Sequence, residues 1–207
     1  MYAIPANGVL FVDGWVRRAW QLDGVDDYVE VPNHSSLNFG TTNLSFEGWG
    51  RLSSAEAYTL SYSLLDKRMM SPYRGYHIAL QSRKMVLQLA DGGYTNWVST
   101  IAIPNDDHWH HVAVTVNRVS STGINFYVDG QPAGTFSPLA RSGDLTNTAP
   151  LRFGRSSLSN SGSIKMGMDE FSLYKRALSS TEIQSIFNSG RFGACKNFEH
   201  DDWWPGE

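Results

Sequence analysis

The chain contains a single cysteine, Cys195, among its 207 residues. One cysteine cannot form an intramolecular disulfide, and no C-x-x-C spacing indicates a zinc site. The hydrophobic core must therefore hold the fold, and a chain of this length can bury roughly 70% of its unfolded surface without cross-links. Cysteine content leaves the compartment undecided, because exported and cytosolic domains can both lack disulfides.

Long apolar runs and clusters of basic residues are also lacking. No stretch reaches the roughly 18 apolar residues of a membrane span. The start, MYAIPANGVLFVDG, lacks the basic region and continuous apolar core of an intact signal peptide. The 17 basic and 20 acidic residues are spread along the chain, so no Lys/Arg row could neutralise a phosphate backbone. We expect neither membrane insertion nor nucleic-acid binding.

Short runs of alternating apolar and polar residues recur along the chain. They predict β-strands, because side chains of successive strand residues point to opposite faces. Asp129-Gly130 predicts a tight hairpin turn. Runs spaced by about ten residues, with turn residues between them, are typical of a sandwich or barrel. The runs lie at residues 44–49, 76–80, 85–89, 109–116, 124–128, 151–154 and 171–174.

One helix is predicted near the C-terminus. Ser179 and Glu182 form a Ser-x-x-Glu capping box, and apolar residues at positions 183, 186 and 187 make one stripe. Gly190 can end the helix in the left-handed conformation. We expect this short helix to cap one end of the sandwich.

Several segments, in this order, resemble the laminin G-like (concanavalin A-like) jelly-roll family of bacterial extracellular and phage-associated proteins. The resemblance covers roughly residues 8–195. It implies an all-β fold, with two antiparallel sheets packed as a jelly-roll sandwich. We divide the chain into a jelly-roll domain, residues 1–195, and an acidic, Trp-bearing tail, residues 196–207. The segments that carry the resemblance are residues 19–32, 44–49, 109–115, 126–130, 151–155, 168–174 and 176–183.

The resemblance also implies a structural Ca²⁺ ion at the rim of the sandwich. Asp169 matches the family's C-terminal ligand, and the loop that holds Asp23 and Asp26 offers carboxylates and a glycine that frees carbonyls. Asn43 could add an oxygen. The family topology places the first and last strands side by side, so we expect Asp23 and Asp169 to share the ion. The alternative is that Asp23 and Asp26 only make Asx-turn hydrogen bonds within their loop.

Catalysis is not expected. Asp169 and Glu170 are adjacent, so they point to opposite faces and lack the close spacing of two glycosidase carboxylates. No Gly-x-Ser-x-Gly elbow is present. His110 and His111 also point to opposite faces, so we interpret them as packed, hydrogen-bonded side chains rather than metal ligands.

Aromatic and charged side chains predict a ligand-binding surface. Sugars bind by stacking on aromatic rings and by hydrogen bonds to a few polar groups. Tyr73, Tyr94 and Trp97 lie near glycine-rich turns, with Asp66 and Arg68 close in sequence. For Trp97, which fits a strand, core or edge packing is the alternative that we favour, whereas we expect Tyr73 and Tyr94 to be exposed.

Two classes of function follow. The preferred one is a non-catalytic structural or adhesive subunit of an extracellular, cell-surface or particle assembly, because laminin G-like modules usually sit in longer polypeptides and no catalytic neighbour is present in this chain. Its partner would be a second copy or another surface protein. The tail residues Phe198–Glu207 would dock on the neighbour, or fold back on their own domain. The alternative is a carbohydrate-binding module that recognises a glycan through exposed aromatics.

Overall fold

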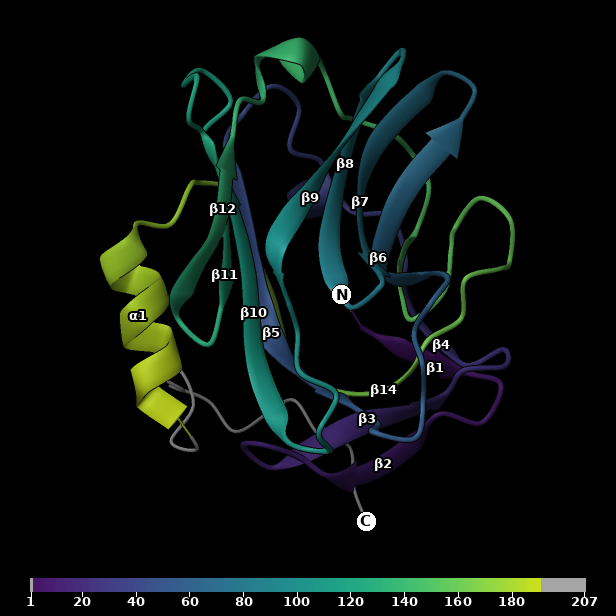
Figure 1. Ribbon diagram of the computed structural model, residues 1–207. Helices are drawn as coiled ribbons and strands as arrows, with labels where there is room; N and C mark the ends of the chain where they lie inside the picture. The colour runs from purple at the N-terminus through teal and green to yellow at the C-terminus, as the bar shows by residue number, and fades with distance from the viewer. Residues whose placement is uncertain (1, 191–207) are drawn as a thin grey trace, which may run out of the picture.

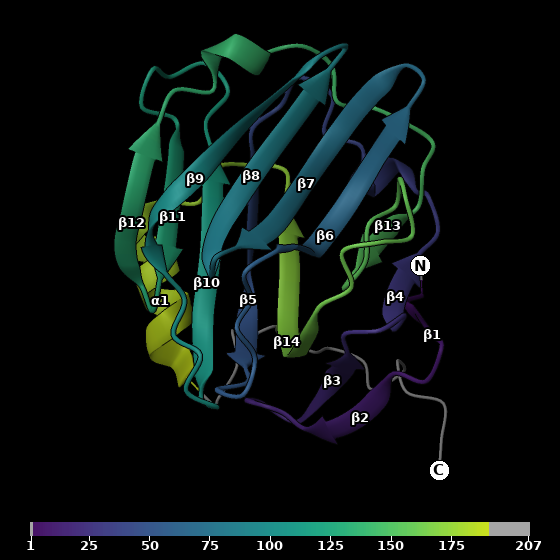
Figure 2. The ribbon, with the colours of Figure 1, turned by 45° about the vertical axis from the view of Figure 1, so that its right-hand side comes forward.

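The computed structural model describes residues 2–190, which fold into a two-layer β-sandwich. Each layer is an antiparallel sheet of seven strands, and the two sheets face each other across one hydrophobic core (Figures 1 and 2). The predicted all-β sandwich with one short C-terminal helix is confirmed. The tail and its predicted docking role lie outside the described residues.

The first sheet has seven strands in the order β1 (Ile4–Ala6), β4 (Tyr28–Val31), β13 (Leu151–Phe153), β6 (Ser61–Met70), β7 (Tyr73–Gln81), β8 (Lys84–Asp91) and β9 (Tyr94–Ala102). The second has the order β12 (Gln131–Phe136), β11 (Ile124–Val128), β10 (Trp109–Val116), β5 (Leu44–Leu52), β14 (Lys165–Tyr174), β3 (Arg18–Asp23) and β2 (Leu10–Asp13). Two single-turn 3₁₀ helices, Ser35–Leu37 and Leu139–Arg141, and one α-helix, α1 (Ser180–Ser189), complete the described elements.

The β7–β8 hairpin shows how the alternating pattern sets the layers. Its turn residues Ser82 and Arg83 both have positive φ, at 48° and 63°, which matches the right-handed twist of the flanking strands. Ile78 pairs with Leu87, and both are buried in the core. The residues between these core positions therefore face outward, and that outer face carries the candidate site.

Helix α1 begins and ends where the sequence predicts. Ser179 accepts a hydrogen bond from the Glu182 amide and Glu182 bonds back to the Ser179 amide, so the capping box is formed. The helix lies along the outer face of the second sheet, not at an end of the sandwich (Figure 1). Its Ile183 packs against Ala113 and Tyr127 of that face. Within residues 2–190, no helix combines the length and apolar character needed to span a bilayer.

A buried lysine fastens two loops to β6. The Nζ atom of the fully buried Lys67 lies 2.9–3.3 Å from five oxygens of Asn33, Asn38, Asn147 and Ala149. Asp66 and Arg68, its neighbours in β6, point to the opposite face. The oxygen cage around Lys67 therefore also fixes the strand that carries those two charges.

We expect Lys67→Met to lower the free energy of unfolding by about 3 kcal/mol, because it leaves several buried oxygens without a donor. Urea denaturation of the purified protein measures this loss. Lys84→Met, a partly exposed lysine at the β7–β8 turn, is the matched control and should change stability by less than about 0.5 kcal/mol. Equal losses in the two variants would show that the cage contributes nothing.

Candidate ligand-binding site

A row of polar side chains crosses the outer face of the first sheet. The strand register pairs Asp66 with His77, His77 with Gln88, and Gln88 with Asn96. Side chains of directly paired residues lie on the same face of a sheet. The four residues therefore form one line across β6, β7, β8 and β9, the strands drawn side by side in Figure 2.

An ion pair between Asp66 and Arg68 anchors this row. Arg68 donates from Nε to Asp66 Oδ1 at 2.7 Å and from Nη2 to Oδ2 at 2.6 Å, a bidentate geometry. Both side chains are buried. Burial alone would raise the pKa of Asp66, but the hydrogen bonds and charge of Arg68 hold that pKa below its usual value. The pair is therefore ionised and internally neutralised.

The ion pair continues into neutral hydrogen-bonding groups. Arg68 Nη1 and the Tyr73 hydroxyl, at 2.8 Å, both donate to Gln88 Oε1, and Gln88 Nε2 donates to Asn96 Oδ1 at 2.6 Å. Every side chain in this part of the row is held by another. We infer that the row is preorganised before any ligand arrives.

His77 takes part as a neutral side chain. Its Nε2 lies 3.0 Å from the Ser63 hydroxyl, and burial lowers its pKa to about 4. The carboxylate of Asp66 opposes this shift, and the guanidinium of Arg68 adds to it. His77 is therefore uncharged at neutral pH.

The loop of residues 154–163 packs over β6 and forms one wall of a groove. The Ser156 hydroxyl and the Ser157 amide each donate to Asp66 Oδ2 at 3.0 Å, and the Ser157 hydroxyl donates to the Arg68 carbonyl. The groove has a volume of about 300 Å³. Its lining is rich in hydroxyl and amide groups and comprises Ser61, Ser63, Arg68, His77, Ala79, Gln81, Val86, Gln88, Asn96, Ser156, Ser159, Ser161 and Gly162.

Two tyrosines extend this polar face beside the groove. The rings of Tyr73 and Tyr94 pack edge to face with centroids 5.5 Å apart, and Tyr94 is 55% exposed. The structure thus brings four of the five predicted ligand-binding residues onto one face. The fifth, Trp97, is wrong as a ligand-binding residue: it pairs with Leu87, points into the core and is only 9% exposed.

Sequence reasoning missed His77, Gln88, Asn96 and the serines. A signal was present, since His77 and Gln88 are the polar exceptions in apolar strand runs. A two-residue turn at 82–83 pairs Gln81 with Lys84 and, four residues further along each strand, His77 with Gln88. Asn96 and the loop serines depend on contacts that no local pattern encodes.

The predicted calcium ligands lie in three separate places. Lys165 of β14 pairs with Asp23, and Asp169 lies four residues further along β14, about 13 Å away. Asp169 instead accepts a hydrogen bond from the Val16 amide at 2.9 Å. Asn43 accepts one from the Arg118 amide at the far end of β5, about 30 Å from Asp23 by strand length. The prediction that Asp23, Asp169 and Asn43 share an ion is therefore wrong.

The loop that follows β3 does gather carboxylates. Ligand oxygens of Asp23, Asp26 and Asp27 lie within 4.8 Å of one another. Asp23 Oδ1 accepts from the Val25 amide at 2.7 Å, which is the Asx-turn alternative, and Asp27 Oδ2 accepts from the Asp23 amide at 3.0 Å. Burial raises the pKa of Asp27. Among the described residues, its Oδ1 is buried without a hydrogen-bond partner.

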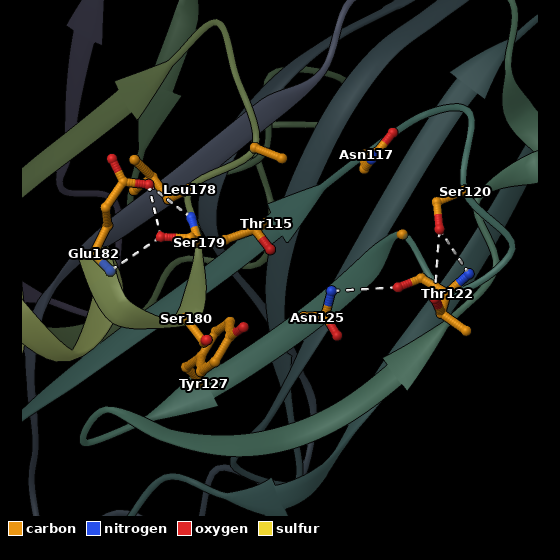
Figure 3. A pocket seen from close by; sticks show the side chains of 12 residues that line it. Thr115, Asn117, Ser120, Thr122, Asn125, Tyr127, Leu178, Ser179, Ser180 and Glu182 are labelled. Atoms are coloured by element: carbon orange, nitrogen blue, oxygen red, sulfur yellow. Dashed lines mark hydrogen bonds between the residues drawn. The ribbon is translucent and has the colours of Figure 1, made fainter.

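A second pocket, of about 490 Å³, lies between the β10–β11 hairpin and the start of α1 (Figure 3). Its hydroxyls serve local structure: Ser179 caps the helix, and Ser120 Oγ lies 3.4 Å from Thr122 Oγ1. Tyr127, its aromatic side chain, is buried. Among the described residues that line it, this pocket offers no exposed ring for stacking.

The two adjacent histidines are packed and hydrogen-bonded, as expected. His111 is fully buried, with Nε2 3.3 Å from Glu47 Oε2. His110 lies between Asp129, at 2.7 Å, and Asp106, at 3.0 Å. Glu47 also accepts from the Tyr174 hydroxyl, so its carboxylate is committed to structure.

Comparison with known proteins identifies the family of this fold. Residues 23–184, well over half of the chain, match the family described as the concanavalin A-like lectin/glucanases superfamily. Paraclostridial mosquitocidal protein 1 of Paraclostridium bifermentans is 23% identical over 200 residues, which cover 88% of this chain and 15% of that protein.

Solved binding domains of toxins share the fold. The binding domain of Paraclostridial mosquitocidal protein 1 is similar with a TM-score of 0.75 and 21% identity, covering 91% of this chain and 47% of that one. The binding domain of botulinum neurotoxin serotype G gives 0.70 and 15%, covering 89% and 46%. The binding domain of botulinum neurotoxin DC, solved with SialylT, gives 0.69 and 16%, covering 91% and 46%. The chain thus spans about half of each solved structure.

The burial of His77 makes stability depend on pH. Its pKa of about 4 in the folded protein lies below the 6.5 of a free histidine, so the unfolded chain binds more protons between these values. The free energy of unfolding should therefore fall by about 3 kcal/mol as pH drops from about 6.5 to 4. Urea denaturation across this range measures the loss.

His77→Gln should flatten this pH dependence, whereas His108→Gln, at a side chain that is 80% exposed, should retain it. Asp66, which faces His77, has its own pKa lowered and titrates below this window, and Arg68 stays charged throughout. An unchanged pH profile in His77→Gln would refute the assignment.

Proposed function

Because the chain belongs to the concanavalin A-like lectin/glucanase superfamily, we propose that it is a non-catalytic glycan-binding module whose site is the groove on the outer face of the first sheet. The observation that carries this proposal is the preorganised polar row from Asp66 to Asn96, covered on one side by a serine-rich loop. Sugar hydroxyls both donate and accept hydrogen bonds, and so do the hydroxyls and amides of this lining.

The tyrosine pair supplies the second element of sugar recognition. Tyr94 exposes an aromatic ring on the same face as the polar row. Tyr73 packs edge to face against that ring and donates a hydrogen bond to Gln88. A sugar stacks its C–H face on such a ring while its hydroxyls reach the amides. The buried polar groups are fixed in advance, which lowers the entropic cost of binding.

The similar proteins support a binding role over catalysis. Their solved structures are described as binding domains, one of them in complex with SialylT and another with rat synaptotagmin II. Such a role would place this domain outside the cell or on a particle surface, where glycans are displayed. Self-assembly through residues Phe198–Glu207 stays a prediction.

We expect a glycan array to identify at least one oligosaccharide that binds, with calorimetry giving its affinity. Tyr94→Ala should weaken that binding about tenfold, since loss of a stacking platform costs about 1.4 kcal/mol. Tyr2→Ala is the matched control, because Tyr2 is 70% exposed and lies near the opposite edge of the same sheet. Silence across the array, or equal effects of both variants, would refute the proposal.

We further propose that the Asp23–Asp27 loop holds a structural Ca²⁺ ion. Three carboxylates converge there, whereas the nearby cation, Arg155, donates to the backbone carbonyls of Asp26 and Asn160 rather than to a carboxylate. The buried Oδ1 of Asp27, unpaired within the described part of the chain, provides an oxygen of the kind that Ca²⁺ prefers. A bound ion would tie the end of β3 to the start of β4.

Calcium at 1 mM should raise the melting temperature by about 5 °C relative to a sample with EDTA. Asp27→Asn should abolish the difference between the two conditions. Asp169→Asn should preserve it, because Asp169 lies about 13 Å further along the sheet. The proposal fails if calcium has no effect on the native protein, if the response survives in Asp27→Asn, or if it vanishes in Asp169→Asn.

A further inference from the structure

The groove carries little free charge, and this narrows the class of glycan that it can bind. Among the described residues, its lining contains only two ionisable side chains, Arg68 and His77. Arg68 is neutralised by the bidentate contact with Asp66, which lies beneath the groove. The remaining polar lining consists of hydroxyls and amides.

Three arginines near the groove and near the tyrosine pair also form ion pairs with carboxylates. Arg74 forms an ion pair with Asp144, and Arg141 forms one with Asp91. Arg152 pairs with Glu30 at 2.8 Å. Each of these three guanidinium groups already has a carboxylate partner. Arg155, at the start of the covering loop, instead donates to the backbone carbonyls of Asn160 and Asp26.

We infer that the site selects neutral glycans over sialylated, sulfated or uronate-containing ones, an inference that rests on the proposed glycan-binding function. An anionic sugar loses part of its hydration when it enters a groove, and only a free cation or several charge-assisted hydrogen bonds can offset that cost. Arg68 cannot turn to a ligand carboxylate without leaving Asp66 buried and unpaired, which is strongly unfavourable. Neutral hydroxyls, in contrast, match the serines, Gln81 and Asn96.

The test compares the affinity of the native protein for matched pairs of oligosaccharides. The two members of a pair share one core structure; one is neutral and the other carries a sialic acid or a sulfate group. We expect the neutral form to bind at least tenfold more tightly. Raising NaCl from 50 to 500 mM should change its affinity less than twofold, because no ion pair forms on binding. Tighter binding of the acidic form would overturn the inference and leave the glycan-binding function intact. Failure of every neutral and acidic glycan would refute that function itself.

A gain-of-charge variant provides an independent test. Ser159 and Ser161 are exposed on the covering loop, so lysines there can be placed without disturbing the core. Ser159→Lys with Ser161→Lys should raise the affinity for the acidic form at least fivefold relative to the affinity of the same variant for the neutral form, which also loses two serine hydroxyls of the lining. Ser121→Lys, on an exposed loop that follows the second sheet's β10, is the control and should change neither. No gain for the acidic form would contradict the charge argument.

Discussion

Two opposite charges buried side by side on β6 organise the candidate site. Asp66 accepts from Arg68 twice and from the loop residues Ser156 and Ser157, so one carboxylate joins the sheet to the wall of the groove. A buried ion pair is weak evidence for stability, since apolar residues of similar size often stabilise a fold as well or better. The ion pair does, however, lie on the outward face of the sheet and is linked to the amide of Gln88 and to Tyr73, which a binding site on that face would require.

The same strand serves two sides of the sheet. Lys67, between the two charged residues, points the other way into an oxygen cage made by two loops that contact each other through Asn38 and Asn147. Because adjacent strand residues face opposite directions, one local stretch fastens loops on one side and organises the groove on the other. The rigidity of the site thus derives from the fold rather than from a ligand.

The layers, the β7–β8 and β11–β12 hairpins and the helix capping box follow from period-2 alternation, turn residues and one Ser-x-x-Glu motif, all of which act locally. The pairing of Asp66 with Arg68 is equally local, because residues two positions apart on a strand point to the same face. The calcium prediction failed because it required the register of β14 against β3, which alternation does not encode. The prediction for Trp97 failed because the sequence alone does not say which face of the sheet its side chain occupies. The register decides this: Trp97 pairs with the core residue Leu87, and its neighbour Asn96 pairs with the outward-facing Gln88.

The serines of the covering loop have two different roles. Ser156 and Ser157 form hydrogen bonds with Asp66 and Arg68, whereas Ser159 and Ser161 are exposed. Substitutions at the exposed pair alter the chemistry offered to a ligand without touching the anchor, so ligand preference can diverge among descendants of this chain while the scaffold persists.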